Sequence, residues 1–363
     1  MTKKVLIVCP DVPEIGGAGK FLWDLAACAS KHSKWEVHLL SPLSKKHIAL
    51  GEEIDYVHGM PGKVKRYWNE SALEMIEKAG ALHNYYDYDL TYIISEMDLL
   101  PAEYYLGGLS NIVYGVHSQQ YHFSNLDMKR PILEQYKGLK PSKSFKKLEE
   151  VEEFAGVWHL ISGLEEKIWN ELHPDKPNYV VLPDMIKETP CFALPWEERT
   201  DNLMFSGRIT GYAKGLSMIR QFLEAYPEKT VDITVPRNNL ARAIMLYKKY
   251  SNCNLKYYSD HNDVLREMGR HKVFVNAGTY GPFDLTMIEA LNQGCQIVAG
   301  ASIGATQYVP SFIPEDYTLK AFEEQVENAF SMGNINYYHY PPMDHNAQDF
   351  LDTLYRCCLE GLD

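Results

Sequence analysis

Short apolar runs with the composition of β-strands alternate with helical segments along this chain, and this alternation restricts its fold most strongly. Expected strands lie at 4–9, 35–41, 90–95, 111–116, 156–162, 179–183, 203–207, 231–236, 255–259, 272–278 and 296–300. Helical segments lie between them, among others at 19–31, 143–154, 216–226 and 239–250. Continuous apolar strands that alternate with helices are typical of parallel sheets covered on both faces. The sequence therefore predicts an α/β protein.

The 363 residues are enough for two hydrophobic cores, since domains usually contain about 100–200 residues. A segment with prolines, mixed charges and little periodicity separates the two series of strands. We expect an N-terminal domain at 1–183, a linker at 184–202, a C-terminal domain at 203–340 and a final helical segment at 341–363 that crosses back to the first domain. The predicted fold is two doubly wound Rossmann-like domains that face a cleft, with ligands at the carboxyl ends of the strands.

The net charge of −12 argues against a general nucleic-acid coat. Two basic segments at 63–68 and 128–147 nevertheless suit a phosphate-bearing acceptor, either nucleic acid or a lipid-linked glycan at a membrane surface. A solvated surface is the simpler explanation of both segments. The candidate acceptor contacts are Lys63, Lys65, Arg66, Trp68, Lys129 and Arg130.

Seven scattered cysteines form no Cys-x-x-Cys pair, so we expect reduced thiols and no zinc site. No stretch approaches the roughly 18 apolar residues that a membrane span needs. We expect a cytoplasmic protein that is free, peripheral to a membrane surface, or acting on DNA in an infected host cell.

A glycine pair, Gly16 and Gly17, follows the first strand. It is not part of a P-loop, because the Gly-Lys pair at 19–20 is followed by Phe21 in place of Ser or Thr. A dinucleotide fingerprint fails as well, because Leu22 stands where the third glycine belongs. The pair still permits a tight turn, and the backbone amides at the start of the next helix can face an anion or a sugar.

Two motifs in the second half of the chain are more specific. Arg208 follows a strand, and Lys214 and Gly215 precede a helix. Two cations beside a helix N-terminus are suited to binding a diphosphate.

The second motif lies at 278–304, where Pro282 suits the first position of a helix. The backbone amides of the next residues should then be free to meet phosphate or sugar oxygens. These residues are Phe283, Asp284 and Leu285. Glu289 lies two turns along, where its carboxylate could accept both hydroxyls of a ribose; a glutamate on the helix surface is the alternative.

Taken together, these motifs resemble the GT-B glycosyltransferases, specifically the large retaining group (glycosyltransferase group 1, family 4-like) that uses nucleotide-sugar donors. The resemblance covers nearly the whole chain. It includes the glycine pair, His117 at a strand end, the segment LISGLEEKIW at 160–169, the SGR…KG motif at 206–215 and the block at 281–295.

The resemblance implies a role for each matching residue. Arg208 and Lys214 would bind the donor diphosphate and stabilise the leaving charge, and His117 would contact the transferred sugar near its reacting carbon. Glu289 would hold the ribose. The other donor contacts would be Gly16, Gly17 and the amides of Phe283, Asp284 and Leu285. The expected donor is a UDP-sugar such as UDP-glucose, and no further cofactor is expected.

The chain departs from the family pattern at two positions. Gly281 stands where the first of two glutamates belongs, which leaves the identity of the donor sugar open, because that glutamate normally contacts the sugar hydroxyls. Asp284 replaces a usual glycine. Asp284 either takes over the missing contact or simply complements the helix dipole.

The implied reaction is a same-face substitution with retention, assisted by the departing phosphate. The Asp-Tyr-Asp sequence at 87–89 matches the metal-binding signature of the other large glycosyltransferase fold, but no second feature supports it. We therefore expect no metal.

Three alternatives remain open. The segment 206–215 and Gly281 weakly resemble phage enzymes that glucosylate hydroxymethylated pyrimidines in DNA, which would have to reach a base that is extruded or exposed in a groove. Nucleotide-sugar 2-epimerases share the architecture, with His261 and Asp263 as candidate acid/base residues. A non-catalytic binding protein is the third.

Overall fold

The computed structural model describes residues 2–8, 17–42, 66–67, 88–94, 111–116, 121–122, 140–141, 156–175, 178–207, 215–278, 280–281, 283–300, 303–334 and 340–360. Their contacts divide the chain into two compact units. Unit 1 contains the described residues up to 122, those of 140–188 and those from 341 onward, and unit 2 contains 189–340.

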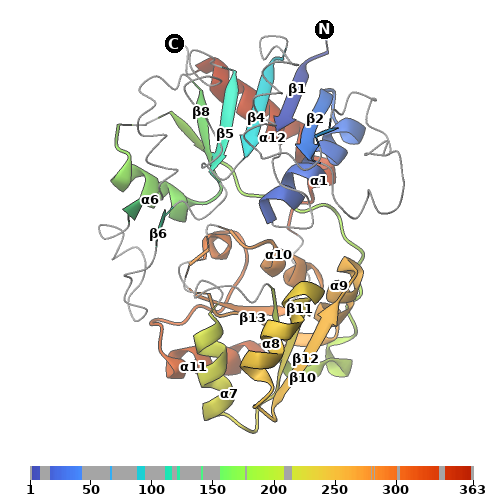
Figure 1. Ribbon diagram of the computed structural model, residues 1–363, viewed down its shortest axis with the longest axis vertical. Coiled ribbons are helices and arrows are strands. Elements are labelled where there is room, and N and C mark those ends of the chain that lie inside the picture. The colour runs from blue at the N-terminus through green and yellow to red at the C-terminus, as the bar shows by residue number, and fades with distance from the viewer. Residues whose placement is uncertain are drawn as a thin grey trace. The chain divides into compact units, whose positions relative to one another are not determined.

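Unit 1 is built on a parallel sheet with the strand order β3-β2-β1-β4-β5-β8-β9 (Figure 1). Its strands are β1 (Lys4–Val8), β2 (Glu36–Pro42), β3 (Arg66–Tyr67), β4 (Leu90–Ile94), β5 (Ile112–Val116), β8 (Val157–Leu160) and β9 (Tyr179–Val181). Helices α1 (Gly17–His32), α6 (Gly163–Leu172) and α12 (Met343–Glu360) accompany it. A separate antiparallel pair is formed by β6 (Tyr121–His122) and β7 (Lys140–Pro141).

The sequence explains why this sheet is parallel and central. Every residue of β4, β5 and β8 is buried, as expected for strands that are covered on both faces. The chain runs from β1 outward to β3 and then returns to β4 on the other side of β1. This reversal is the doubly wound arrangement, and it places a topological switch point between β1 and β4.

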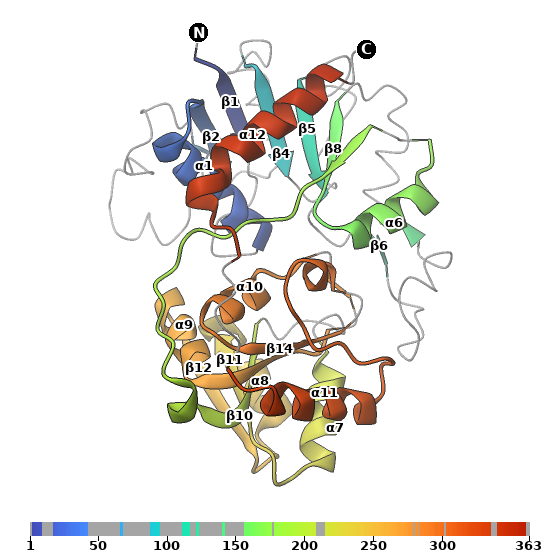
Figure 2. The same ribbon diagram turned by 180° about the vertical axis from the view of Figure 1, so that it is seen from behind.

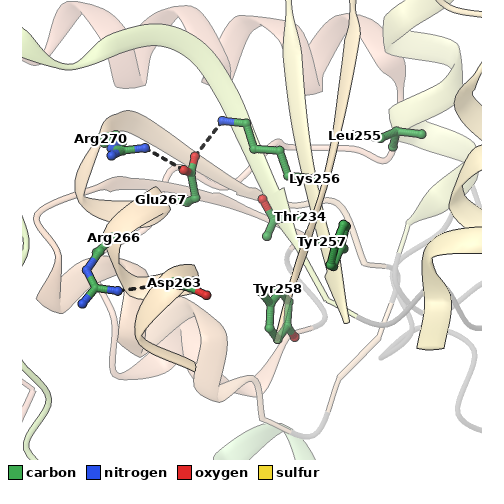
Figure 3. A pocket seen from close by; sticks show the side chains of 9 residues that line it. All are labelled: Thr234, Leu255, Lys256, Tyr257, Tyr258, Asp263, Arg266, Glu267 and Arg270. Atoms are coloured by element: carbon green, nitrogen blue, oxygen red, sulfur yellow. Dashed lines mark hydrogen bonds and ion pairs between the residues drawn. The ribbon is translucent and has the colours of Figure 1, made fainter. Parts of the chain in front are cut away.

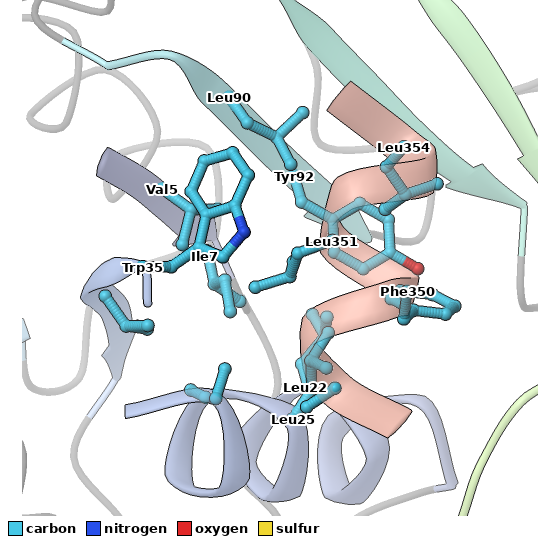
Figure 4. Close-up of a cluster of buried hydrophobic side chains, with 14 of the residues drawn as sticks. Val5, Ile7, Leu22, Leu25, Trp35, Leu90, Tyr92, Phe350, Leu351 and Leu354 are labelled. Carbon is cyan, nitrogen blue, oxygen red and sulfur yellow. The ribbon is translucent and has the colours of Figure 1, made fainter. Parts of the chain in front are cut away.

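Helix α12 packs against α1 and one face of the unit 1 sheet (Figure 2). Its side chains in the hydrophobic core are Met343, Ala347, Phe350, Leu351, Leu354 and Cys358. The rings of Phe21 and Phe350 meet edge to face with 5.8 Å between their centroids, and Figure 4 shows the surrounding cluster. Trp35 Nε1 donates a hydrogen bond to Asp352 Oδ1 at 3.1 Å. The C-terminal helix therefore completes the core of the unit that contains the start of the chain.

Unit 2 is built on a second parallel sheet with the order β12-β11-β10-β13-β14. Its strands are β10 (Thr200–Ser206), β11 (Val231–Pro236), β12 (Cys253–Tyr258), β13 (His271–Asn276) and β14 (Gln296–Ala299). Its helices are α7 (Leu216–Ala225), α8 (Leu240–Tyr247), α9 (His261–Gly269), α10 (Leu285–Asn292) and α11 (Leu319–Ser331), with short 3₁₀ turns η5 (Trp196–Glu198), η6 (Arg237–Asn239) and η7 (Gly304–Gln307).

The two faces of β11 show how unit 2 is organised. Val231, Ile233 and Val235 enter a hydrophobic core that includes side chains of α7 and α11. Asp232 and Thr234 alternate with them and therefore point to the opposite face. Both units are doubly wound parallel sheets, which confirms the predicted α/β fold class. Within the described residues, no helix is long and apolar enough to cross a membrane.

Candidate functional site

The strand order of unit 2 locates its candidate site. Strands β10 and β13 are neighbours, and the chain builds outward from them in opposite directions, through β11 and β12 on one side and β14 on the other. Ligands of doubly wound sheets bind at the carboxyl ends of the strands at such a switch point. Here these ends are Ser206 and Asn276.

Helix α7 begins next to the end of β13. Gly215 caps its N-terminus with φ of 69° and ψ of 24°, in the left-handed region. A Cβ atom on Gly215 would lie 1.8 Å from the carbonyl oxygen of Ala277, so only glycine allows this approach. The hydroxyl of Tyr317 donates to the same carbonyl. The N-terminal end of α7, with its positive dipole, therefore lies close to Ala277, the residue after β13.

Helix α10 begins at Leu285, so the prediction that Pro282 occupies the first helical position is wrong. Asp284 is the N-cap, and its Oδ1 accepts a hydrogen bond from Thr286 N at 3.2 Å. Its Oδ2 accepts from Asn276 Nδ2 at 2.7 Å. The carboxylate of Asp284 thus stabilises the helix start and joins it to the end of β13.

Two backbone amides remain at this helix start. Within the described part of the chain, no hydrogen bond engages the amides of Phe283 or Leu285. Leu285 is the first residue of the helix, where backbone amides carry partial positive charge and bind anions readily, whereas Phe283 lies one residue before the N-cap. The sequence had predicted free amides at Phe283, Asp284 and Leu285, and their contact with a donor stays a prediction.

Glu289 lies one turn after the start of α10 and is buried. Its side chain is 3% exposed, and Oε1 lies 3.0 Å from His261 Nε2. The sequence left open a glutamate on the helix surface, and this burial excludes it. A buried carboxylate is costly unless charged or polar groups compensate it, and His261 is such a group.

Only some of the other predicted site residues lie in the part of the chain that the structure describes. Gly17 is the exposed first residue of α1, after the carboxyl end of β1. Arg66 is described by its backbone alone, in β3. The other predicted residues lie outside the described part: Gly16, His117, Arg208, Lys214, Lys63, Lys65, Trp68, Lys129 and Arg130.

Part of the Asp-Tyr-Asp sequence is visible, and its interactions are structural. The backbone amide of Lys4 donates to Asp89 Oδ2 at 2.7 Å. Tyr88 is buried, and its hydroxyl lies 2.7 Å from His38 Nδ1. Asp87 lies outside the described residues. Asp89 therefore joins the start of β1 to that of β4.

A polar groove of about 450 Å³ lies between β12 and α9 (Figure 3). Glu267 accepts from Lys256 at 2.7 Å and from Arg270 at 2.9 Å, and Asp263 accepts from Arg266 at 3.0 Å. Each cation of the groove is thus already paired with a carboxylate. The groove could not be predicted from the sequence, because its residues come from β11, β12 and α9, which meet only in the fold.

Beside the groove, Asp232 lies in a buried polar network. His271 Nε2 is 3.0 Å from Asp232 Oδ2, and Asn254 and Asn202 donate to Oδ1 at 2.8 and 3.1 Å. Burial alone would raise the pKa of Asp232, but the hydrogen bonds of His271 and Asn254 and the positive charges nearby lower it to about 2. His271 Nδ1 also faces the carbonyl oxygen of Glu267 at 2.6 Å. Both ring nitrogens of His271 thus face hydrogen-bond acceptors.

The pairing of His261 with Glu289 was also missed. The sequence suggested His261 only as an acid/base residue of an epimerase. The signal that was present is the stretch Ser-Asp-His-Asn at 259–262, which predicts a helix start directly after β12. This stretch does not indicate which buried group the helix start would face.

Comparison with known proteins identifies the fold. No protein-family model matches the sequence, and no curated protein sequence matches it. Among solved structures, sucrose-phosphate synthase from Thermosynechococcus elongatus aligns with a TM-score of 0.67 at 13% identity, over 99% of this chain and 97% of that chain. The catalytic domain of starch synthase IV from Arabidopsis thaliana, bound to ADP and acarbose, aligns with a TM-score of 0.65 at 13% identity, over 99% of both chains.

A third similar structure is Anabaena HepE in complex with UDP and glucose, with a TM-score of 0.60 at 13% identity over 99% of both chains. These matches extend over both units, since each covers 99% of this chain. The chain has the two-domain, Rossmann-like GT-B fold, as predicted.

Proposed function

We propose that this chain is a glycosyltransferase that binds a nucleotide-sugar donor in unit 2, at the carboxyl ends of β10 and β13. The observation that carries the proposal is the buried carboxylate of Glu289, four residues or about 6 Å along α10 from its first residue. The order of the groups on α10 matches a nucleotide. The start of the helix corresponds to the diphosphate, and Glu289 corresponds to the ribose with its two hydroxyl donors. The solved structures of the same fold that contain ADP or UDP support this assignment.

In this proposal each described group has a chemical task. The amides of Phe283 and Leu285 and the N-terminal turn of α7 after Gly215 stabilise the negative charge of the diphosphate. Glu289 accepts hydrogen bonds from the ribose hydroxyls. Asp284 keeps α10 in place by its bond to Asn276. Preorganised donors of this kind contribute about 2.7–4 kcal/mol each to the stabilisation of a developing charge.

The remaining roles rest on the resemblance alone. Arg208 and Lys214 would add positive charge at the leaving diphosphate, and His117 would contact the transferred sugar. Gly16 and Gly17 would allow a close backbone approach. Breaking the bond between sugar and phosphate leaves negative charge on the diphosphate, so fixed cations and amides there lower the barrier. We propose that the sugar is transferred with retention and that no metal is needed.

Two observations bear on the competing interpretations. An epimerase would need His261 and Asp263 as acid/base groups, but His261 pairs with Glu289 and Asp263 accepts from Arg266. The bond between Asp89 and the Lys4 amide gives the Asp-Tyr-Asp sequence a structural use. The acceptor of the sugar is proposed only as a hydroxyl compound.

The donor site is tested by calorimetric titration of the whole chain with UDP, ADP, GDP and CDP. We expect one nucleoside diphosphate to bind below millimolar concentration, and Glu289→Ala to weaken its binding by about tenfold or more, because hydrogen bonds to a charged group are worth about 1.5–3 kcal/mol. Glu224→Ala is the matched control, because Glu224 is a solvent-exposed glutamate near the end of α7.

The titration contradicts the proposed function if none of the four ligands binds, or if both variants bind as the unmodified chain does. Product analysis with the matching labelled nucleotide sugar then separates transfer or hydrolysis from epimerisation. The same reaction in EDTA tests the metal independence.

A further inference from the structure

Helix α8 exposes a face that combines cations with apolar side chains. The segment 237–250, which contains η6 and α8, has four basic residues and no acidic residue, although the whole chain has a net charge of −12. Ile244 and Met245 lie in the middle of this segment and are 40% and 80% exposed. The four basic residues lie before and after them and are also exposed: Arg237, Arg242, Lys248 and Lys249. These six residues form what we call the α8 face.

The opposite side of α8 is fixed in the fold. Ala243 and Tyr247 are buried in the hydrophobic core of unit 2, against the side chains of α7 and α11. At 3.6 residues per turn, Met245 lies about 200° around the helix axis from each of them. Met245 therefore lies in the middle of the outward side of α8, where the core cannot bury it.

The edge strand of the sheet extends this apolar surface. Strand β12 packs against α8 at the edge of unit 2 (Figure 1). Tyr257 of β12 pairs in register with Val235, which enters the core below α8, so Tyr257 points to the same side of the sheet and is 55% exposed. The described part of the chain exposes six large apolar side chains, and three of them lie on α8 and β12: Ile244, Met245 and Tyr257.

The cations of the α8 face are available to a ligand. Among the described residues, the side chains of Arg237, Arg242 and Lys248 take part in no hydrogen bond or ion pair. Lys249 lies 3.2 Å from Glu224, but these side chains are 66% and 55% exposed. Water screens such a surface pair, so it opposes the binding of another anion only weakly.

We propose that the α8 face, together with Tyr257, docks unit 2 on an anionic lipid surface. Helices that lie in the membrane interface combine basic side chains, which meet lipid phosphates, with apolar side chains, which enter the acyl boundary. A nucleic acid would engage the cations through its phosphates but would leave Ile244 and Met245 in water. Such docking would not depend on the nucleotide site proposed above.

The test is sedimentation of the whole chain with vesicles of phosphatidylcholine alone and of equal amounts of phosphatidylcholine and phosphatidylserine. We expect binding to the anionic vesicles only, and weaker binding as the salt concentration rises. Arg242→Gln and Lys248→Gln should each weaken it by about fivefold, and Met245→Gln by about fivefold or more. The matched controls are Lys320→Gln and Met332→Gln, which change an exposed lysine and an exposed methionine outside the α8 face.

Thermal unfolding checks that each variant is folded, which we expect because every substitution is at an exposed side chain. The docking surface is overturned if anionic vesicles do not sediment the chain, or if vesicles of phosphatidylcholine alone sediment it equally. It is also overturned if either the basic variants or Met245→Gln bind as tightly as their controls. Binding to duplex DNA that Arg242→Gln and Lys248→Gln weaken, without binding to vesicles, would assign the face to nucleic acid instead. Each of these outcomes leaves the titration with nucleoside diphosphates as a separate test of the proposed function.

Discussion

At the scale of single residues, two glycines of unit 2 have different reasons to be glycine. Gly215 has a positive φ, and a Cβ there would overlap the Ala277 carbonyl. Gly281 has no such backbone restriction, and its Cβ would lie 3.4 Å from the terminal methyl of Ile303. Gly215 is therefore required by the close approach of the backbone before α7 to Ala277, the residue after β13. The backbone at Gly281 could also carry a side chain. The departure from the family pattern at this position is therefore a change of side chain and not of backbone conformation.

This difference predicts the stability of two variants. Gly215→Ala should lower the free energy of unfolding by about 2–5 kcal/mol, because the left-handed conformation costs about 1–2 kcal/mol and overpacking adds about 1–3 kcal/mol. Gly281→Ala should change it by about 1 kcal/mol or less. Urea unfolding of both variants measures these changes. Equal losses in the two proteins would show that the close approach of Gly215 to Ala277 is not a constraint.

At the scale of elements, the start of α10 was not predicted correctly from the sequence. Proline at 282 predicted a helix that begins there, whereas the helix begins at Leu285. The deciding interaction is the bond from Asn276 Nδ2 to Asp284 Oδ2, which joins the end of β13 to the N-cap. Local propensity describes Pro282 and Asp284 equally well as helix-start residues. Only the contact with the neighbouring strand selects Asp284.

The network around Asp232 joins β11, β12 and β13, and it gives unit 2 a pH dependence. The pKa of Asp232 is lowered from its ordinary value of 3.8 to about 2. A carboxyl whose pKa is lower in the folded chain stabilises the fold above pH 4 and loses this contribution as the pH falls toward 2. The contribution is about 2 kcal/mol, at 1.36 kcal/mol per pKa unit.

Asp232→Asn removes this pH dependence. At pH 7 we expect a loss of about 1–3 kcal/mol in the free energy of unfolding, because the buried side chains of His271 and Asn254 lose their charged hydrogen-bond acceptor. Between pH 5 and pH 2 the difference in the free energy of unfolding between Asp232→Asn and the unmodified chain should decrease by about 2 kcal/mol. Asp201→Asn is the control, since Asp201 is 79% exposed and pairs with Lys272 at the surface. The free energies of unfolding are measured by urea unfolding. A difference between the two proteins that stays constant across this pH range would contradict the lowered pKa of Asp232.

At the scale of the whole molecule, the alternation of strands and helices was sufficient to predict the fold class. The observed strands, such as β4 at Leu90–Ile94 and β5 at Ile112–Val116, match the apolar runs, because strands buried on both faces show little polar alternation. The candidate site was harder to predict from the sequence than the fold class. Glu289 was identified from its place on the expected helix, and the family resemblance gave it a role. Its burial and its partner His261 depend on the packing of α9 against α10, which sequence periodicity does not report.

The central claim is that a nucleoside diphosphate binds where the carboxyl ends of β10 and β13 meet the N-termini of α7 and α10. Hydrogen–deuterium exchange of the whole chain, with and without the nucleoside diphosphate that binds best, tests it most directly. We predict slower exchange of the backbone amides at 215–219 and 283–289, because these amides and their helix starts would contact the ligand. Ligand binding that leaves both segments unchanged and slows exchange elsewhere would contradict the account.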